Sequence, residues 1–282
     1  MSIRALVVGG TSGTGYALAC RLAADPSTIS VIISGRTKPA SLPHSNMHFK
    51  PIDATSMRNI KAYTDAFKAS EKEKLDYLVL TQGVINLDGR VETPEGIDRK
   101  MAVHYYGRQM LIRELLPSLA TDAKVISVYD SASGDPSKLN WQDFDLKDTF
   151  SLANAAQHCM NMNDIMTQRF ASTQSAGEKR HFVHAYPSLV NTNIGRDLAW
   201  YMRVPAKALQ VAVATKPSVW AERLMSGLEL RVEEGEREGK RWHYLDQKGR
   251  NIKNKKLWTE EEVEKVVGHT WGLLDAAVAT KD

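Results

Sequence analysis

The sequence has few of the residues that mark secreted or membrane-spanning proteins. Only two of its 282 residues are cysteines, Cys20 and Cys159, and both lie in segments with a helical pattern. A disulfide framework is therefore not indicated, and we expect reduced thiols and a cytoplasmic protein. No apolar run approaches the roughly 18 residues that a spanning helix needs, so no membrane partner is expected. Because the first apolar strand begins within a few residues of Met1, we expect no signal peptide.

An excess of charge of one sign is also absent. The chain has 37 basic and 33 acidic residues, a formal net charge of +4, which does not favour nucleic acid as a partner. Its 43% of hydrophobic and 25% of charged residues are ordinary for a soluble globular protein. We see no internal repeat, no low-complexity segment and no linker. The sequence therefore predicts a single domain over residues 1–282.

Short apolar segments with the character of strands alternate with segments that have a helical pattern. The expected strands cover residues 5–8, 30–34, 48–53, 75–80, 124–129 and 181–186. The expected helices between them cover residues 16–23, 55–70, 94–119 and 150–171. This alternation predicts an α/β fold of the Rossmann type, a doubly wound parallel sheet with helices on both faces.

The remaining chain is less regular. Residues 193–235 are interpreted either as a packed surface subdomain or as a loop that covers a substrate, with a helix from 217 to 232. A last strand is expected at 241–245, and the basic run over 248–256 is interpreted as a solvated turn. Thr259 and Glu262 form a capping box that opens a C-terminal helix. The apolar stripe of that helix belongs either to the core or to a subunit contact.

A glycine-rich turn joins the first strand to the first helix. It comprises Gly9, Gly10, Thr11, Ser12, Gly13, Thr14 and Gly15. At such a turn the free backbone N–H groups and the helix dipole favour an anion, and glycines let a pyrophosphate approach the backbone closely. We therefore predict a dinucleotide at this turn. No metal site is predicted.

The end of the second strand indicates which dinucleotide is bound. An acidic residue that binds a ribose 2′-hydroxyl is expected there, but the sequence reads Ser34-Gly35-Arg36-Thr37. The planar cation of Arg36 suits a 2′-phosphate, which a carboxylate would repel. The sequence therefore favours NADP(H) over NAD(H) as the cofactor.

Together these segments resemble the short-chain dehydrogenase/reductase family over residues 3–192. Gly9, Gly13 and Gly15 match its cofactor loop, and Asp53 matches the acid that contacts adenine. Gly83 keeps the glycine of the motif after the fourth strand. Residues 186–192 resemble the segment that holds the nicotinamide amide, which assigns Val190 and Thr192 to cofactor binding. The amino-acid sequences of residues 103–107 and 150–152 are similar to those of a fungal branch of the family that acts in secondary metabolism.

The family's catalytic residues are only partly matched. The family uses Asn, Ser and a helical Tyr-x-x-x-Lys pair, in which Tyr protonates the substrate oxygen and Lys holds the ribose. On the helix after the fifth strand, Phe150 is assigned to the Tyr position and Asn154 to the Lys position, beside the cofactor. His104 is assigned to the Asn position, and Ser131 is the serine that survives. The resemblance thus implies cofactor binding without the family's usual proton donor.

Several other groups are candidates for that donor. His104 and Asp130 are predicted to act with Ser131, because histidine titrates near neutrality and Asp130 follows a strand end where ligands gather. Tyr129, Tyr186 and His158 are alternatives. Each has a structural interpretation as well, such as a capped turn for Asp130.

Three functions remain open from the sequence. The first is an NADP(H)-dependent oxidoreductase for a small, largely apolar carbonyl or alcohol substrate, with a non-standard proton donor. The second is a redox-neutral isomerase, cyclase or dehydratase, and the third is a non-catalytic dinucleotide-binding protein. By analogy, long helices with apolar faces are compatible with a homo-oligomer.

Overall fold

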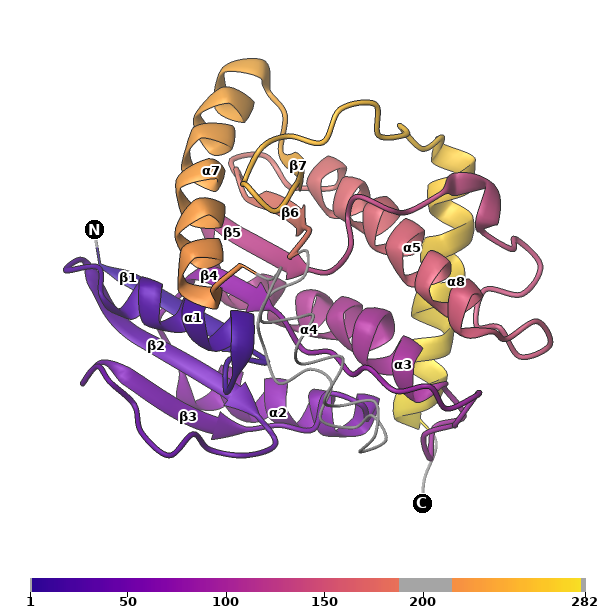
Figure 1. Ribbon diagram of the computed structural model, residues 1–282, viewed down its shortest axis with the longest axis horizontal. Helices are drawn as coiled ribbons and strands as arrows, with labels where there is room; N and C mark the ends of the chain where they lie inside the picture. The colour runs from indigo at the N-terminus through magenta and orange to yellow at the C-terminus, as the bar shows by residue number, and fades with distance from the viewer. Residues whose placement is uncertain (1, 188–214, 280–282) are drawn as a thin grey trace.

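The computed structural model describes residues 2–187 and 215–279, and within them seven parallel strands form one sheet (Figure 1). The order of the strands is β3-β2-β1-β4-β5-β6-β7. The chain thus starts in the middle of the sheet and winds outward in both directions, which confirms the predicted fold class. The strands are β1 (Ile3–Val8), β2 (Thr28–Gly35), β3 (Met47–Pro51), β4 (Leu75–Leu80), β5 (Leu119–Val128), β6 (His181–Ala185) and β7 (Trp242–Leu245).

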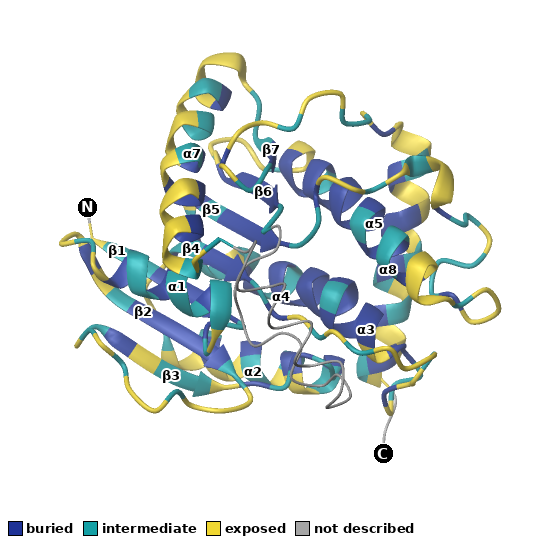
Figure 2. Ribbon diagram, viewed as in Figure 1, coloured by how far each residue is buried: buried dark blue, intermediate teal, exposed yellow. Residues whose placement is uncertain are grey.

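Helices cover both faces of the sheet. One face carries α1 (Gly13–Ala23) and α7 (Pro217–Glu238), which pack against each other. The other face carries α2 (Met57–Ser70), α4 (Gly107–Leu115) and α5 (Leu152–Ser172). Outside this layer lies α8 (Glu260–Ala279), which contacts α2 and α5. The strands are buried between the two layers, whereas the outer sides of the helices are exposed (Figure 2).

The central strands are apolar throughout because both of their faces are covered. In β1, Leu6 and Val8 face the core under α2, α4 and α5, whereas Ala5 and Val7 face the core under α1 and α7. This is the pattern of a buried parallel strand rather than of a half-exposed one.

The helix predicted over residues 94–119 is shorter and irregular. It begins with α3 (Arg99–Met101), passes through a π-helical turn, η1 (Ala102–Tyr106), and continues as α4. The carboxylate of Asp98 accepts hydrogen bonds from the N–H groups of Lys100 and Met101, so Asp98 rather than Pro94 sets the start. A 3-10 turn, η2 (Leu116–Ser118), ends the segment, and β5 follows at once from Leu119 instead of Lys124.

The C-terminal helix confirms its predicted cap. The N–H of Thr259 donates to Glu262 Oε2 at 3.0 Å, and Thr259 Oγ1 accepts from the N–H of Glu262 at 3.3 Å. The apolar stripe of α8 is buried in the core, and hydroxyl contacts at 2.7 and 2.8 Å join Tyr105 to Thr270 and Tyr106 to His269.

The predicted cover over 193–235 is described only in part. Residues 217–235 belong to α7, where Trp220, Leu224 and Leu228 are buried against the sheet, so this part is not a loop. Residues 193–214, including Trp200–Leu209, lie outside the described residues.

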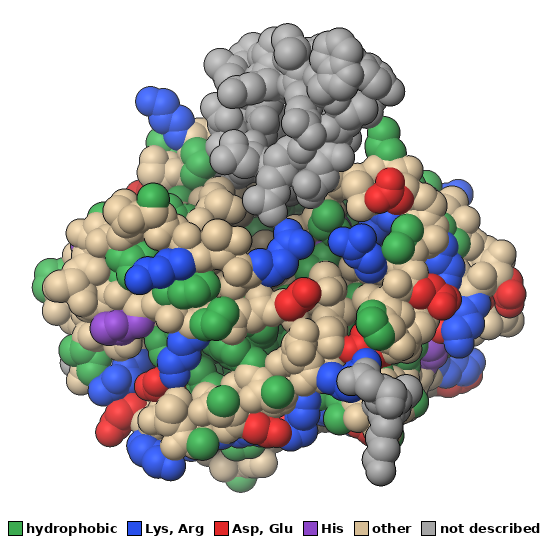
Figure 3. All heavy atoms as spheres, turned by 90° about the horizontal axis from the view of Figure 1, so that it is seen from below, with side chains coloured by type: hydrophobic (Ala, Val, Ile, Leu, Met, Phe, Trp, Pro, Cys, Tyr) green, Lys and Arg blue, Asp and Glu red, His purple; other side chains and the backbone are tan. Residues whose placement is uncertain are grey.

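Three further expectations concern chemistry and surface. Cys20 and Cys159 are both free thiols. No helix in the described parts of the chain is long and apolar enough to cross a membrane. In the basic run, Arg250 pairs with Asp246 and Lys256 with Glu262. On the face seen in Figure 3, basic and acidic side chains are interspersed rather than gathered by sign.

Candidate functional site

The turn between β1 and α1 is shaped so that only glycine fits at several of its positions. Gly9 and Gly13 have φ angles of +83° and +58°, which other residues rarely adopt. A Cβ atom on Gly9 would lie 2.5 Å from the backbone nitrogen of Gln82, and one on Gly15 would lie 2.2 Å from Thr81 Oγ1. The turn is therefore packed directly against the end of β4, where the order of the strands reverses.

The same turn presents unused donors. Gly13, Thr14 and Gly15 form the first turn of α1, where N–H groups have no partner within the helix. Ser12 is the N-cap, but its side chain makes no capping bond, and no acidic residue lies in the first turn. Thr11 fills the space beside Gly35 at the end of β2. The predicted residues 9–15 thus form a helix N-terminus with unpaired N–H groups at the carboxyl edge of the sheet, a geometry that favours an anion.

Gln82 gives independent evidence that a polar group binds here. Its side chain is buried, and neither amide atom has a hydrogen-bond partner among the described residues. Buried amide groups are almost always paired in folded proteins. The backbone of Gln82 lies against Gly9, so Gln82 and the N–H groups of the turn share one edge of the sheet and together offer donors suited to the phosphate and ribose oxygens of a dinucleotide. The sequence pattern did not single out Gln82.

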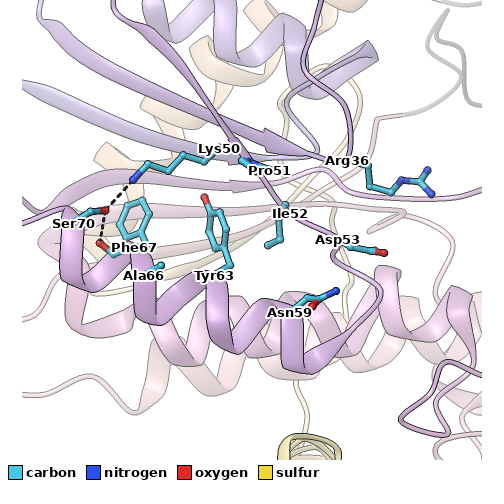
Figure 4. Close-up of a pocket in the computed structure, with 10 residues that line it drawn as sticks. All are labelled: Arg36, Lys50, Pro51, Ile52, Asp53, Asn59, Tyr63, Ala66, Phe67 and Ser70. Atoms are coloured by element: carbon cyan, nitrogen blue, oxygen red, sulfur yellow. Dashed lines mark hydrogen bonds between the residues drawn. The ribbon is translucent and has the colours of Figure 1, made fainter. Parts of the chain in front are cut away.

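The ends of β2 and β3 form the other side of the predicted cofactor site. Arg36 is exposed and makes no hydrogen bond or ion pair with a described residue. Asp53 Oδ1 accepts hydrogen bonds from the N–H and the hydroxyl of Thr55, at 3.0 and 2.8 Å. Both residues line one end of a groove of about 620 Å³ between β3 and α2 (Figure 4). Tyr63 and Phe67 line the middle of the groove, and Lys50 and Ser70 its far end.

His104 lies in the π-helical turn η1, beneath the loop after β4. Its Nε2 atom accepts a hydrogen bond of 2.9 Å from the N–H of Val84. A Cβ on Gly83 would approach the same nitrogen to 3.3 Å, so Gly83 leaves room for the ring. Burial and the nearby charges of Arg108 and Lys100 lower the pKa of His104 to about 3. The imidazole is therefore neutral at physiological pH and does not titrate near neutrality as the sequence suggested.

The other two predicted catalytic residues use their polar atoms in the fold. The hydroxyl of the fully buried Ser131 donates to the carbonyl oxygen of Leu245 at 2.9 Å. Asp130 Oδ1 accepts from the N–H groups of Ala132 and Ser133, both at 2.9 Å. Asp130 thus caps the turn after β5, which was its structural interpretation.

Phe150 and Asn154 do not meet the turn after β5. Phe150 precedes α5 and lies under Lys100, whose Nζ is 5.6 Å from the ring centroid. Asn154 is exposed, and its Nδ2 donates to the carbonyl oxygen of Thr149 at 2.7 Å. The structure therefore does not place this pair beside Ser131.

Two other side chains of α5, four residues apart, reach that turn. Gln157 Oε1 accepts from the N–H of Asp135 at 2.8 Å, and Asn161 Nδ2 donates to the Asp135 carbonyl at 2.9 Å. The sequence analysis did not identify these two residues. The signal available in the sequence was a pair of amide side chains four residues apart, on one face of a helix that is otherwise rich in methionine and alanine. One Tyr-x-x-x-Lys does occur in the chain, at Tyr244 and Lys248, but Tyr244 is buried in β7 with its hydroxyl bonded to α5.

His158 and Tyr186, two of the alternative donors, have contacts of different kinds. His158 is buried and holds the segment before α5, since its Nε2 accepts from the N–H of Asn140 and its Nδ1 lies 3.1 Å from the Phe144 carbonyl. Tyr186 follows β6, and its carbonyl accepts from the Trp220 indole. Val190 and Thr192, predicted to bind the cofactor, lie outside the described residues.

The third alternative, Tyr129, lies against a buried cation that the sequence did not reveal. Arg108 is 1% exposed and donates to Ser127 Oγ and to the carbonyls of Val128 and Gln82. Its guanidinium carbon is 5.5 Å from the centroid of the Tyr129 ring. No carboxylate of the described chain forms an ion pair with it. The carboxyl edges of β4 and β5 thus enclose an uncompensated positive charge.

Comparison with known proteins agrees with these features. No family model matches the chain. It is 40% identical to an oxidoreductase of the fungus Emericella nidulans over 205 residues, which cover 68% of this chain and 60% of that protein. It is 28% identical to a short-chain dehydrogenase/reductase of Stachybotrys chartarum over 218 residues, 67% of this chain and 61% of that protein. The chain therefore spans about three fifths of the length of these relatives.

The fold has a close counterpart among solved structures. The chain superimposes on the NADPH-bound carbonyl reductase from chicken fatty liver with a TM-score of 0.61 at 15% identity, covering 89% of this chain and 99% of that one. With the parallel sheet and the glycine turn, these relationships show that the chain resembles the short-chain dehydrogenase/reductase family in sequence and fold.

Proposed function

We propose that this protein is an oxidoreductase that uses NADP(H) and acts on a small, largely apolar carbonyl or alcohol substrate through a non-standard proton donor. The observation that carries the proposal is the glycine turn packed on β4, flanked by Arg36, which has no partner among the described residues and stands where an acid would select NAD(H). The fungal relatives and the NADPH-bound structural neighbour support the same interpretation.

In this proposal the pyrophosphate lies on the N–H groups of Gly13, Thr14 and Gly15, and the 2′-phosphate lies beside Arg36. Gln82 supplies hydrogen bonds to the part of the cofactor above β4. Asp53, at the end of the groove between β3 and α2, lies where the adenine is expected. The bound nicotinamide supplies or accepts the hydride, which requires orientation more than it requires protein acids.

The substrate lies, in this proposal, over the carboxyl ends of β4 and β5. The buried Arg108 favours negative charge that develops there on an oxygen atom. A redox-neutral reaction is the second candidate, because no helical Tyr-x-x-x-Lys of the described chain stands by the turn after β5. A cytoplasmic location and a role in fungal secondary metabolism belong to the proposal as well.

The test measures NADPH binding by fluorescence and NADPH oxidation at 340 nm with ketones, enones and imines. Binding together with oxidation supports the oxidoreductase. Binding without any oxidation favours the redox-neutral reaction, and no binding refutes the proposal.

A further inference from the structure

The structure also identifies a pair of donors for the substrate oxygen, an inference that rests on the proposed function. We propose that the Nδ1–H of His104 and the hydroxyl of Tyr129 together bind the substrate carbonyl oxygen, and that Tyr129 donates the proton. Arg108, buried behind the Tyr129 ring, stabilises the phenolate that remains.

The contacts of His104 determine which nitrogen carries its proton. Because Nε2 accepts from the N–H of Val84, the single proton of the neutral ring resides on Nδ1. Nδ1 has no hydrogen-bond partner among the described residues, and it is not one of the fully buried atoms without a partner. The Nδ1–H is therefore a donor that the described residues leave unused. A neutral imidazole used in this way polarises a carbonyl without giving up its proton.

Tyr129 offers the second donor at the same place. Its ring centroid is 4.9 Å from that of His104, and the two planes are inclined by 47°. Its hydroxyl makes no hydrogen bond to a described residue and is likewise absent from the fully buried atoms without a partner. The ring itself is held by parallel stacking on His184 at 6.4 Å. Two unused donors on neighbouring rings form the kind of site that binds a developing oxyanion.

Arg108 supplies the charge that the family's lysine would otherwise give. Burial raises the pKa of Tyr129, Cys159 and Asp130 add to the rise, and the Arg108 cation opposes it. Burial lowers the pKa of Arg108 only to about 10, so the guanidinium stays charged at neutral pH. Its three hydrogen bonds go to neutral oxygens. Its charge is thus available to an anion on Tyr129.

Three other candidate proton donors already make hydrogen bonds within the fold. Ser131 donates to Leu245, and Asp130 caps the turn after β5. His184 donates from Nδ1 to Asp164 at 2.7 Å and lies behind the Tyr129 ring rather than in open space.

In carbonyl reduction, the carbonyl carbon gains the hydride that NADPH supplies. The Tyr129 O–H bond breaks, a new O–H bond forms on the substrate oxygen, and water then reprotonates the Tyr129 phenolate. Together, the carbonyl compound, NADPH and one proton from solvent become the alcohol and NADP⁺.

The experiment compares Tyr129→Phe and His104→Phe with the wild type, using NADPH and a panel of benzaldehyde, cyclohexanone and 9,10-phenanthrenequinone. Tyr77→Phe is the matched control, because Tyr77 packs against the core on the opposite face of the sheet. We expect Tyr129→Phe to lower kcat by about 10²–10⁴-fold. His104→Phe should lower it by about 10²–10³-fold. NADPH affinity should stay within about twofold, and Tyr77→Phe should match the wild type.

Two further measurements separate chemistry from folding. With cyclohexanol and NADP⁺, kcat/KM should rise with pH in the wild type and become independent of pH in Tyr129→Phe. Arg108→Lys should retain more activity than Arg108→Met, because it keeps the charge. If Tyr129→Phe binds NADPH and reduces the panel within threefold of the wild type, the inference is refuted and the proposed function stands. A wild type that binds NADPH but reduces no member of the panel refutes both.

Discussion

The Nε2 atom of His104 accepts a hydrogen bond of 2.9 Å from the backbone N–H of Val84. The bond joins the loop after β4 to the π-helical turn η1, and π turns often occur at functional sites. It also fixes the ring as a neutral donor through Nδ1. A proton on Nε2 would break this bond and add a third cation beside Arg108 and Lys100.

His104 should therefore not titrate in the physiological range. Because burial and two cations lower its pKa to about 3, its NMR ring resonances should stay constant between pH 8 and pH 5. An unperturbed histidine would show a midpoint near its usual pKa of about 6.5. A midpoint between pH 6 and pH 7 for His104 would contradict its assignment as a neutral hydrogen-bond donor.

Arg36 should control the choice of cofactor. Arg36→Asp replaces a cation suited to a 2′-phosphate with a carboxylate that repels it, so NADPH affinity should fall at least tenfold. NADH affinity should rise or stay constant, as measured by fluorescence titration. Lys72→Asp makes the same charge change at an exposed position after α2 and is the control. An equal loss of affinity for NADPH and NADH in Arg36→Asp would argue against a contact with the 2′-phosphate.

Gly15 and Gly268 should respond in opposite ways to alanine. In Gly15→Ala the new Cβ meets Thr81 Oγ1 at 2.2 Å, so the turn must shift, and both stability and NADPH affinity should fall. Gly268 lies within α8, and a methyl group there would meet no heavy atom within 4 Å, so Gly268→Ala should raise the free energy of unfolding by about 0.5–1 kcal/mol. Chemical denaturation measures both changes. Wild-type NADPH affinity in Gly15→Ala would contradict the cofactor site.

A pair of buried histidines should make the fold sensitive to acid. Arg241 Nη1 lies 2.8 Å from His181 Nε2, and His181 Nδ1 lies 2.9 Å from His243 Nε2. Burial lowers the pKa of His181 to about 4 and that of His243 to about 3. In the unfolded chain both take up protons near pH 6.5, so the stability present above that pH is lost as the pH falls toward 4.

The expected loss between pH 7 and pH 5 is on the order of 4 kcal/mol for the pair, measured by urea denaturation. His243→Gln removes one of the two titrating groups and should flatten the curve, although it can lower stability at pH 7. His48→Gln changes an exposed histidine in β3 and is the control. Equal slopes in the wild type and His243→Gln would show that other groups cause the acid sensitivity.

The sequence was sufficient for the sheet, since continuous apolar strands and helical periodicity between them leave few other arrangements. It was also sufficient for the glycine turn, whose function depends on local backbone geometry. It failed at two helix starts, where side-chain caps decide the first residue. The carboxylate of Asp98 begins a helix that was placed at Pro94, and Ser151 begins α5 after Phe150 rather than before it.

The contacts of α5 also differ from the assignment made from the sequence. The sequence assigned Phe150 and Asn154 to the family's Tyr and Lys positions, whereas Gln157 and Asn161 are the side chains that reach the segment after β5. Arg108 escaped notice because an arginine in a helix is usually exposed, and only the tertiary structure buries it between two strand ends. No sequence pattern indicates that the side-chain amide of Gln82 is buried without a hydrogen-bond partner among the described residues.

The central claim is that the glycine turn and Arg36 bind a phosphorylated dinucleotide for hydride transfer. A fluorescence titration of the wild-type protein with NADPH, repeated with NADH, tests it most directly. We predict saturable binding of NADPH, at least tenfold tighter than that of NADH. Absence of NADPH binding at sub-millimolar protein and cofactor, or tighter binding of NADH, would contradict it.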